Sequence, residues 1–213
     1  AVLAVHRSDR CGGCGGRHVF AAALLQQRLS DFCDKKLGLM LHFGPYTNAG
    51  LIESWALCDQ DAAWSQKQID WTNDIDHFKR QYYGLSRSFN PIRFDPARWA
   101  KTAKEAGAGY VLFTMKHHDG FCMYDTAYTD YKVTAPDCPF SVEENADIAR
   151  ALFERCRAEG LWVAAYFSKP DWHHEDYWEN HGIGYQTTRY PSYHTKQDPE
   201  RWARFVRSAC TGA

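Results

Sequence analysis

The chain has 213 residues, 45% of them hydrophobic, and a formal net charge of −1. A chain of this length can bury one sizeable core. The balanced charge, without a cluster of excess lysine and arginine, argues against a nucleic-acid partner. No window of about 18 apolar residues predicts a membrane span.

Residues 1–27 are expected to form a flexible N-terminal tail, because glycines surround Cys11 and Cys14, the one close pair among eight scattered cysteines. A single such pair is weak evidence for zinc, and the scattered cysteines favour reduced thiols over a disulfide framework. The start also lacks the apolar stretch of a secretory signal. We therefore favour a cytoplasmic location, with a secreted or lysosomal one left open. The absence of an initiating Met is compatible with a processed or partial chain.

Three apolar runs, at residues 37–42, 110–115 and 161–167, predict strands buried on both faces. They alternate with three predicted helices, which is typical of parallel βαβ units. The first helix is expected to begin with Asp95 as N-cap and Pro96 at the first helical position, and to end at Gly107. Its apolar positions are Trp99, Ala100, Ala103 and Ala106.

The second helix is expected to begin at Ser141, which stands in capping-box spacing to Glu144, and to end at Gly160. One stripe of this helix is apolar: Ile148, Ala149, Leu152, Phe153 and Cys156. The third helix is expected to begin at Asp198-Pro199 and to bury Trp202, Phe205 and Val206.

Two long segments, residues 43–91 and 168–197, are interpreted as loops that follow strand ends. The second strand runs directly into Lys116-His117-His118-Asp119-Gly120-Phe121. Site residues of α/β barrels lie at the carboxyl ends of the strands. We therefore expect a pocket formed by His42, the first long loop, the His117-His118 segment and the loop after Tyr166.

The fold class predicted is α/β, a (β/α)₈ TIM-like barrel of which this chain carries the first three βα units. Eight units are needed to close such a barrel. Residues 28–213 are therefore interpreted as the N-terminal portion of a catalytic barrel that stops before the fourth strand. Either the chain is a fragment or a homo-oligomer covers the open edge of the sheet.

Several spaced blocks resemble the α-L-fucosidases of glycoside hydrolase family 29, over roughly residues 28–206. These blocks are Lys36-Leu37-Gly38-Leu39-Met40-Leu41-His42-Phe43-Gly44, Phe94-Asp95-Pro96-Ala97-Arg98-Trp99, Ala106-Gly107-Ala108-Gly109-Tyr110, Lys116-His117-His118-Asp119-Gly120-Phe121, and Tyr166-Phe167-Ser168 with Asp171-Trp172. The resemblance implies hydrolysis of α-linked L-fucose from glycans or glycosides with retention of configuration. The chemistry would use two carboxylates and no cofactor.

The resemblance also implies which residues bind the sugar. His42, His117 and His118 would hydrogen-bond fucose hydroxyls, because imidazole offers one donor and one acceptor. Tyr166 would lie near the sugar. The Glu-Trp pair of the family corresponds to Glu53 and Trp55, here separated by one residue.

The catalytic residues are expected to be missing from this chain. In the family, the nucleophilic aspartate ends the fourth strand and the acid/base carboxylate comes later, so both would lie beyond Ala213. No residue from 1 to 213 matches either motif, and Asp119 and Asp171 are not assigned to those roles. A non-catalytic fucose-binding or structural half-barrel therefore remains the alternative.

A metal-dependent hydrolase is the third interpretation. It would use His42, His117, His118 and Asp119, with His173-His174 as further donors. This interpretation ranks last because no strong metal-ligand spacing is present. We therefore predict no metal.

Overall fold

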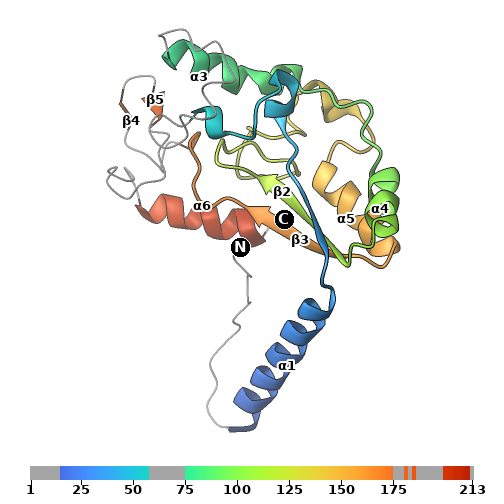
Figure 1. Ribbon diagram of the computed structural model, residues 1–213. Coiled ribbons are helices and arrows are strands. Elements are labelled where there is room, and N and C mark those ends of the chain that lie inside the picture. The colour runs from blue at the N-terminus through green and yellow to red at the C-terminus, as the bar shows by residue number, and fades with distance from the viewer. Residues whose placement is uncertain (1–14, 58–74, 175–179, 182–183, 186–198, 212–213) are drawn as a thin grey trace.

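A three-stranded parallel sheet forms the centre of the computed structural model (Figure 1). The structure describes residues 15–57, 75–174, 180–181, 184–185 and 199–211. The strands β1 (Gly38–Leu41), β2 (Tyr110–Lys116) and β3 (Trp162–Phe167) lie side by side in chain order. The predicted strands and their parallel arrangement are confirmed. Burial is most complete in the central strand, where Tyr110 and Leu112 are the partly buried residues. The outer strands are more open, because Met40 of β1 is 44% exposed and Trp162 of β3 is 39% exposed.

The helices α4 (Pro96–Glu105) and α5 (Ile148–Ala158) lie side by side, with α5 packed against β2 and β3 (Figure 1). The predicted start of α4 is confirmed, since the Asp95 side chain accepts a hydrogen bond from the backbone N–H of Arg98 at 2.9 Å. Gly107 follows the helix with φ +82°, a left-handed conformation that favours glycine. The end of α4 at Gly107 therefore fixes where β2 begins, three residues later, at Tyr110.

The second helix begins later than predicted. Ser141 lies in a 3₁₀ turn, Pro139–Val142, and the N-cap of α5 is Asp147, whose carboxylate accepts from Arg150 N at 3.0 Å. Aspartate is as good an N-cap as serine. The backbone between Ser141 and Asp147 forms tight turns instead of helix, with hydrogen bonds such as Ala146 N to Glu143 O. The predicted end is right, with Gly160 at φ +72°.

One core lies between the sheet and these two helices. It includes Val111 and Phe113 of β2, Ala100 and Ala103 of α4, and Leu152 of α5, all at most 1% exposed. Three thiols, of Cys122, Cys138 and Cys156, are buried and free. Tight packing at this face fixes the position of the central strand and of the residues that follow it.

The predicted flexible tail over residues 1–27 is wrong in part, because the helix α1 (Gly15–Asp34) covers its second half. Residues 18–29 contain alanine, leucine, glutamine and arginine, which are strong helix formers that outweigh the preceding glycines. The helix projects away from the sheet (Figure 1). Residues 1–14 lie outside the described part of the chain.

The two long segments are not plain loops. The first contains the 3₁₀ helices η1 (Pro45–Ala49), η2 (Trp55–Leu57) and η3 (Gly84–Ser88) and the α-helix α3 (Ile75–Tyr83). The second contains two paired short strands, β4 (Asn180–His181) and β5 (Gly184–Tyr185), and precedes α6 (Pro199–Thr211).

The helix α6 begins where Asp198-Pro199 predicted, and Phe205 is buried within it. The side chain of Trp202 is outside the described set. Ala213, the predicted last residue of the barrel portion, also lies outside the described residues, which end at Thr211. The boundary expected at Ala213 therefore stays a prediction. None of the helices described is long and apolar enough for a membrane span.

Candidate functional site

The carboxyl ends of the three strands bring the predicted aromatic site residues together. His42 follows β1, His117 follows β2 and Tyr166 lies in β3, with ring centroids 5.8 Å apart for the two histidines. His117 stacks on Tyr166 at 5.8 Å and an interplanar angle of 11°, and its ring lies 4.5 Å from that of His118. The predicted shared location of these residues is confirmed. A strand that ends in Lys116-His117-His118 can direct both imidazoles to one place because Gly120 turns the chain there at φ +83°.

Glu53 lies at the centre of this cluster, between two histidines. Its carboxylate oxygens lie 3.0 Å from His42 Nδ1 and 3.3 Å from His117 Nε2. Trp55 Nε1–H also donates to Glu53 Oε2 at 2.8 Å. Glu53 has φ +53°, uncommon for a residue with a side chain, and such backbone conformations gather at functional sites. The imidazoles of His117 and His42 hold the pKa of Glu53 well below its ordinary value, so the group is a carboxylate at neutral pH.

Trp55 and Trp172 form an aromatic wall beside the histidines. The Trp55 ring lies 5.1 Å from the His118 ring, and the Trp172 ring lies 5.0 Å from it on another side. The extra residue between Glu53 and Trp55 therefore does not remove the tryptophan from the site. Such rings can cover the apolar face of a bound ligand.

Two serines contact the histidine pair, and the sequence did not predict either of them as a site residue. Ser54 Oγ lies 2.5 Å from His117 Nδ1, and Ser168 Oγ bonds His118 Nδ1. Ser54 is fully buried. The only local indication that Ser54 belongs to the site is its position between the two predicted residues Glu53 and Trp55.

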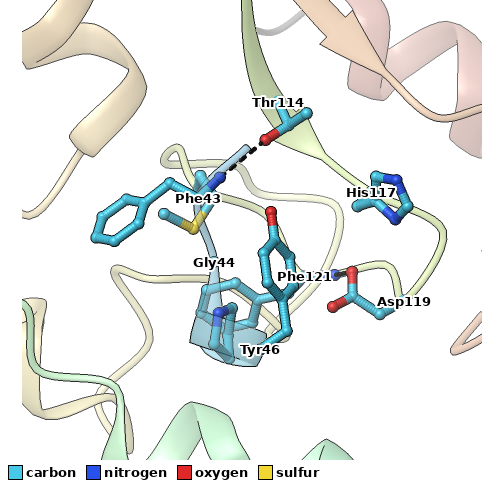
Figure 2. Close-up of a pocket in the computed structure, with 9 residues that line it drawn as sticks. Phe43, Gly44, Tyr46, Thr114, His117, Asp119 and Phe121 are labelled. Carbon is cyan, nitrogen blue, oxygen red and sulfur yellow. Dashed lines mark hydrogen bonds between the residues drawn. The ribbon is translucent and has the colours of Figure 1, made fainter. Parts of the chain in front are cut away.

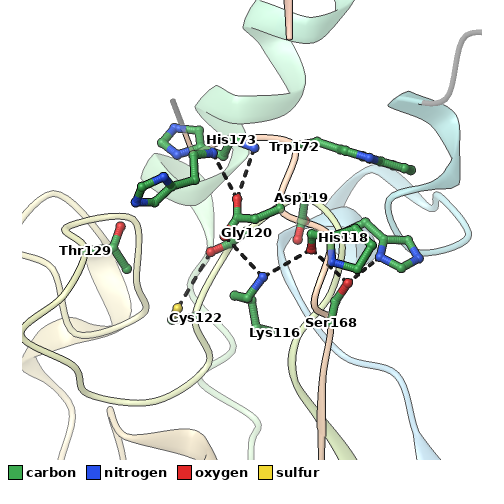
Figure 3. A network of polar contacts seen from close by, with 12 residues as sticks. Lys116, His118, Asp119, Gly120, Cys122, Thr129, Ser168, Trp172 and His173 are labelled. Atoms are coloured by element: carbon green, nitrogen blue, oxygen red, sulfur yellow. Dashed lines mark hydrogen bonds and ion pairs between the residues drawn. The ribbon is translucent and has the colours of Figure 1, made fainter. Parts of the chain in front are cut away.

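A buried ion pair joins Lys116, the last residue of β2, to Asp171 in the segment after β3. Figure 3 shows Lys116 in the same polar network as Ser168 and His118. Lys116 Nζ lies 3.1 Å from Asp171 Oδ2, and the two side chains are 0% and 3% exposed. Burial, the largest single cause, would raise the pKa of Asp171, but the Lys116 ammonium together with His173 and His174 outweighs burial and holds it below its ordinary value. Asp171 Oδ1 also accepts from the backbone N–H groups of His173 and His174 at 3.1 and 3.0 Å. The pair therefore fixes both segments that carry site residues.

Asp119 lies beneath the histidines, where a small pocket is lined by Tyr46, Thr114 and His117 (Figure 2). It accepts hydrogen bonds from the Tyr82 hydroxyl at 2.9 Å and from Phe121 N at 3.3 Å. Burial raises the pKa of Asp119. These contacts give Asp119 a structural role and fit the expectation that it is not the nucleophile.

The residue set suggested for a metal-dependent hydrolase is not brought together as proposed. In the described part of the chain, the donor atoms of one trio, His42, Glu53 and His117, lie within 4.8 Å of one another. Both histidine nitrogens are at hydrogen-bonding distance from Glu53, and Asp119 is committed to Tyr82. His173 stacks on Tyr131 at 4.2 Å, outside this trio. The geometry favours a carboxylate that lies between two imidazoles, with His42 Nδ1 close to it but outside hydrogen-bond geometry.

Comparisons with known proteins identify relatives of this arrangement. The family model described as alpha-L-fucosidase matches residues 21–208. A putative alpha-L-fucosidase 1 from Oryza sativa is 31% identical over 79% of this chain and 28% of its own length. The human tissue alpha-L-fucosidase is 25% identical over 76% of this chain and 34% of its own. The chain thus spans about a third of the length of these curated relatives.

Solved structures give the same result. The alpha-L-fucosidase isoenzyme 1 of Paenibacillus thiaminolyticus is 32% identical, with a TM-score of 0.60 over 82% of this chain and 37% of its own. A Thermotoga maritima alpha-fucosidase, solved with a mechanism-based inhibitor, has a TM-score of 0.60 at 26% identity, over 83% of this chain and 42% of its own. The structural likeness therefore extends over most of this chain.

Proposed function

Since the chain belongs to the α-L-fucosidase family of glycosidases, we propose that it forms the L-fucose-binding part of a hydrolase that removes α-linked L-fucose from glycans or glycosides. His42, Glu53, Trp55, His117, His118 and Tyr166 form the proposed binding site. Its three βα units would belong to a (β/α)₈ barrel. The likeness to solved fucosidases over 82% of this chain supports that assignment.

The observation that carries the proposal is the Glu53 carboxylate held between His42 and His117. A monosaccharide offers vicinal hydroxyls, each of which can donate and accept a hydrogen bond. The Trp55 N–H bond and the neighbouring imidazoles already hold this carboxylate in place, so it can accept a hydrogen bond from a sugar hydroxyl without rearranging. The Trp55 ring beside His118 suits the apolar face of a deoxysugar.

We propose a retaining mechanism whose nucleophile and acid/base lie beyond Ala213, outside the described residues. Retention requires two carboxyl groups about 5 to 5.5 Å apart that flank the scissile bond. The carboxylates near the histidines have other partners: Glu53 binds two imidazoles, Asp119 binds Tyr82 and Asp171 binds Lys116. None of the three is oriented as a free nucleophile.

The absence of a free carboxylate among these three also supports a second function, a non-catalytic fucose-binding or structural half-barrel. Both functions predict background hydrolysis of an aryl α-L-fucoside by the 213-residue chain, so this assay tests where the catalytic carboxylates lie. Turnover above background that is lost in Asp171→Asn or Glu53→Gln would contradict the assignment of the catalytic carboxylates. Turnover at background, with fucose binding retained, is the expected result for the chain alone.

Binding of L-fucose to the chain tests the proposed site directly. Saturation-transfer NMR should detect weak binding of L-fucose and none of its enantiomer D-fucose, which has the same composition but mismatched hydroxyls. His42→Ala and His118→Ala should abolish the signal. His77→Ala, which removes an exposed histidine of α3, should leave it intact. Equal signals for both enantiomers, or signals unchanged in the two site variants, would show the proposal to be wrong.

A further inference from the structure

We infer that Ser54 and Ser168 hold the neighbouring residues His117 and His118 in opposite imidazole tautomers. Each serine contacts the Nδ1 atom of one histidine. The two hydroxyls have different second partners, and those partners decide on which ring nitrogen the proton lies.

The tautomer of His117 follows from Glu53. The carboxylate can only accept, and a lone pair on His117 Nε2 would face Glu53 Oε2 at 3.3 Å and be repelled by it, so the proton belongs on that nitrogen. In a neutral ring, Nδ1 then carries the lone pair. The Ser54 hydroxyl, 2.5 Å away, is the donor to it. Because Ser54 is 0% exposed, water does not compete for this position.

The tautomer of His118 follows from Pro170. Ser168 Oγ lies 2.9 Å from the carbonyl oxygen of Pro170, which can only accept. Two oxygens at that distance require the single hydroxyl proton between them. The remaining contact, with His118 Nδ1, therefore requires a proton on the ring nitrogen. Lys116 Nζ, 3.3 Å from the same carbonyl oxygen, fixes its position (Figure 3).

The opposite tautomers give the two histidines different tasks, an inference that rests on the proposed function. Both nitrogens of His117 are engaged by Ser54 and Glu53, so His117 is a positioning residue that orients the Glu53 carboxylate. The Nε2 atom of neutral His118 is an acceptor. A sugar hydroxyl that meets it must donate. Under this assignment Glu53 and His118 both accept, so a sugar hydroxyl that contacts either of them must donate.

Nitrogen-15 NMR of the imidazoles tests the inference on the unliganded chain. The spectra are recorded at about pH 8, above the pKa of about 6.5 that histidine has in model peptides. Long-range ¹H–¹⁵N correlation separates protonated from unprotonated ring nitrogens, and His117→Gln and His118→Gln assign the signals. We expect the proton on Nε2 in His117 and on Nδ1 in His118.

Serine variants then test the cause. In Ser168→Ala, the His118 proton should move toward Nε2 because the hydroxyl acceptor at Nδ1 is removed. In Ser54→Ala, the His117 proton should stay on Nε2, held by Glu53, while the Nδ1 signal shifts through loss of its donor. Ser86→Ala is the matched control. Ser86 is also buried, at 7% exposure, but its hydroxyl bonds the backbone oxygen of Tyr83.

The same tautomer in both wild-type rings, or a charged ring in either, would overturn the inference. So would a His118 spectrum unchanged by Ser168→Ala. If a serine variant fails to fold, the spectrum of the unmodified chain still decides which ring nitrogens carry the protons. Because no sugar is present, these outcomes are independent of whether the chain binds fucose, and loss of fucose binding would leave the tautomer assignment intact.

Discussion

The buried Lys116–Asp171 pair is the single contact on which the geometry of the site depends most. Asp171→Asn should lower the free energy of unfolding by about 3 to 5 kcal/mol, because it leaves the Lys116 charge buried without its counter-ion. Urea denaturation measures this loss. The matched control is Glu105→Gln, which breaks the Lys101–Glu105 pair at 3.7 Å, where both side chains are about two-thirds exposed. That change should cost at most about 1 kcal/mol. Equal losses in the two variants would contradict the role given to burial.

The same pair gives a signed pH dependence. The pKa of Asp171 in the folded chain lies below its ordinary value of 3.8. A carboxyl group shifted in this direction stabilises the fold above its unfolded pKa, and the contribution is lost as pH falls through the folded value. Stability should therefore drop below about pH 4 less steeply in Asp171→Asn than in the unmodified chain. An equal slope in both would mean that Asp171 does not carry this dependence.

At the scale of elements, Gly120 lets the segment after β2 approach the segment after β3 that carries Asp171. A Cβ atom at Gly120 would collide with Asp171 Oδ1, and the φ of Gly120 is +83°. Gly107 has nearly the same φ, +82°, but open space around the position of its Cβ. Gly107→Ala should therefore cost only the backbone term, about 1 to 2 kcal/mol. Gly120→Ala should cost clearly more and displace the His117-His118 segment. Equal midpoints in thermal unfolding would contradict the close approach.

Local chemistry made part of the fold predictable from the sequence. Asp95, Pro96 and Gly107 act within or next to the helix they bound, so the limits of α4 could be predicted. The apolar runs of the three strands are likewise local. Ser141 shows the limit, because its capping-box spacing is present but Asp147 is the residue that caps α5. The choice between Ser141 and Asp147 as N-cap depends on how the following helix packs, and the local sequence does not encode that packing.

Without the family resemblance, the candidate site was predictable only where a motif marks a strand end. His42, His117 and Tyr166 follow or lie in apolar strands, so their meeting follows from a parallel sheet. Contacts such as Ser54 with His117 join residues 63 positions apart through a segment without strand periodicity. The Lys116–Asp171 pair spans 55 positions. Both depend on the conformation of long connections, which no residue spacing specifies.

At the scale of the whole molecule, the helix α1 leaves an apolar stripe in contact with water. Leu25, Leu29 and Phe32 lie at spacing i, i+4 and i+7, and are 49%, 50% and 47% exposed. This is the pattern of a helix that packs on another element. In the part of the chain that is described, β3 also pairs with β2 on one edge alone. We predict that, in solutions of this 213-residue chain by itself, a second copy covers these surfaces.

The chain should therefore self-associate, with an apparent mass in sedimentation equilibrium that rises from micromolar to near-millimolar concentration. Leu25→Lys with Leu29→Lys should shift the chain toward monomer, because two charges would have to be buried in the helix contact. Val142→Lys is the matched control, since Val142 is 85% exposed and lies outside α1. A chain that is monomeric throughout this range would refute the prediction. Association that the α1 double variant leaves unchanged would place the contact away from the stripe and make the unpaired edge of β3 the surface to alter next.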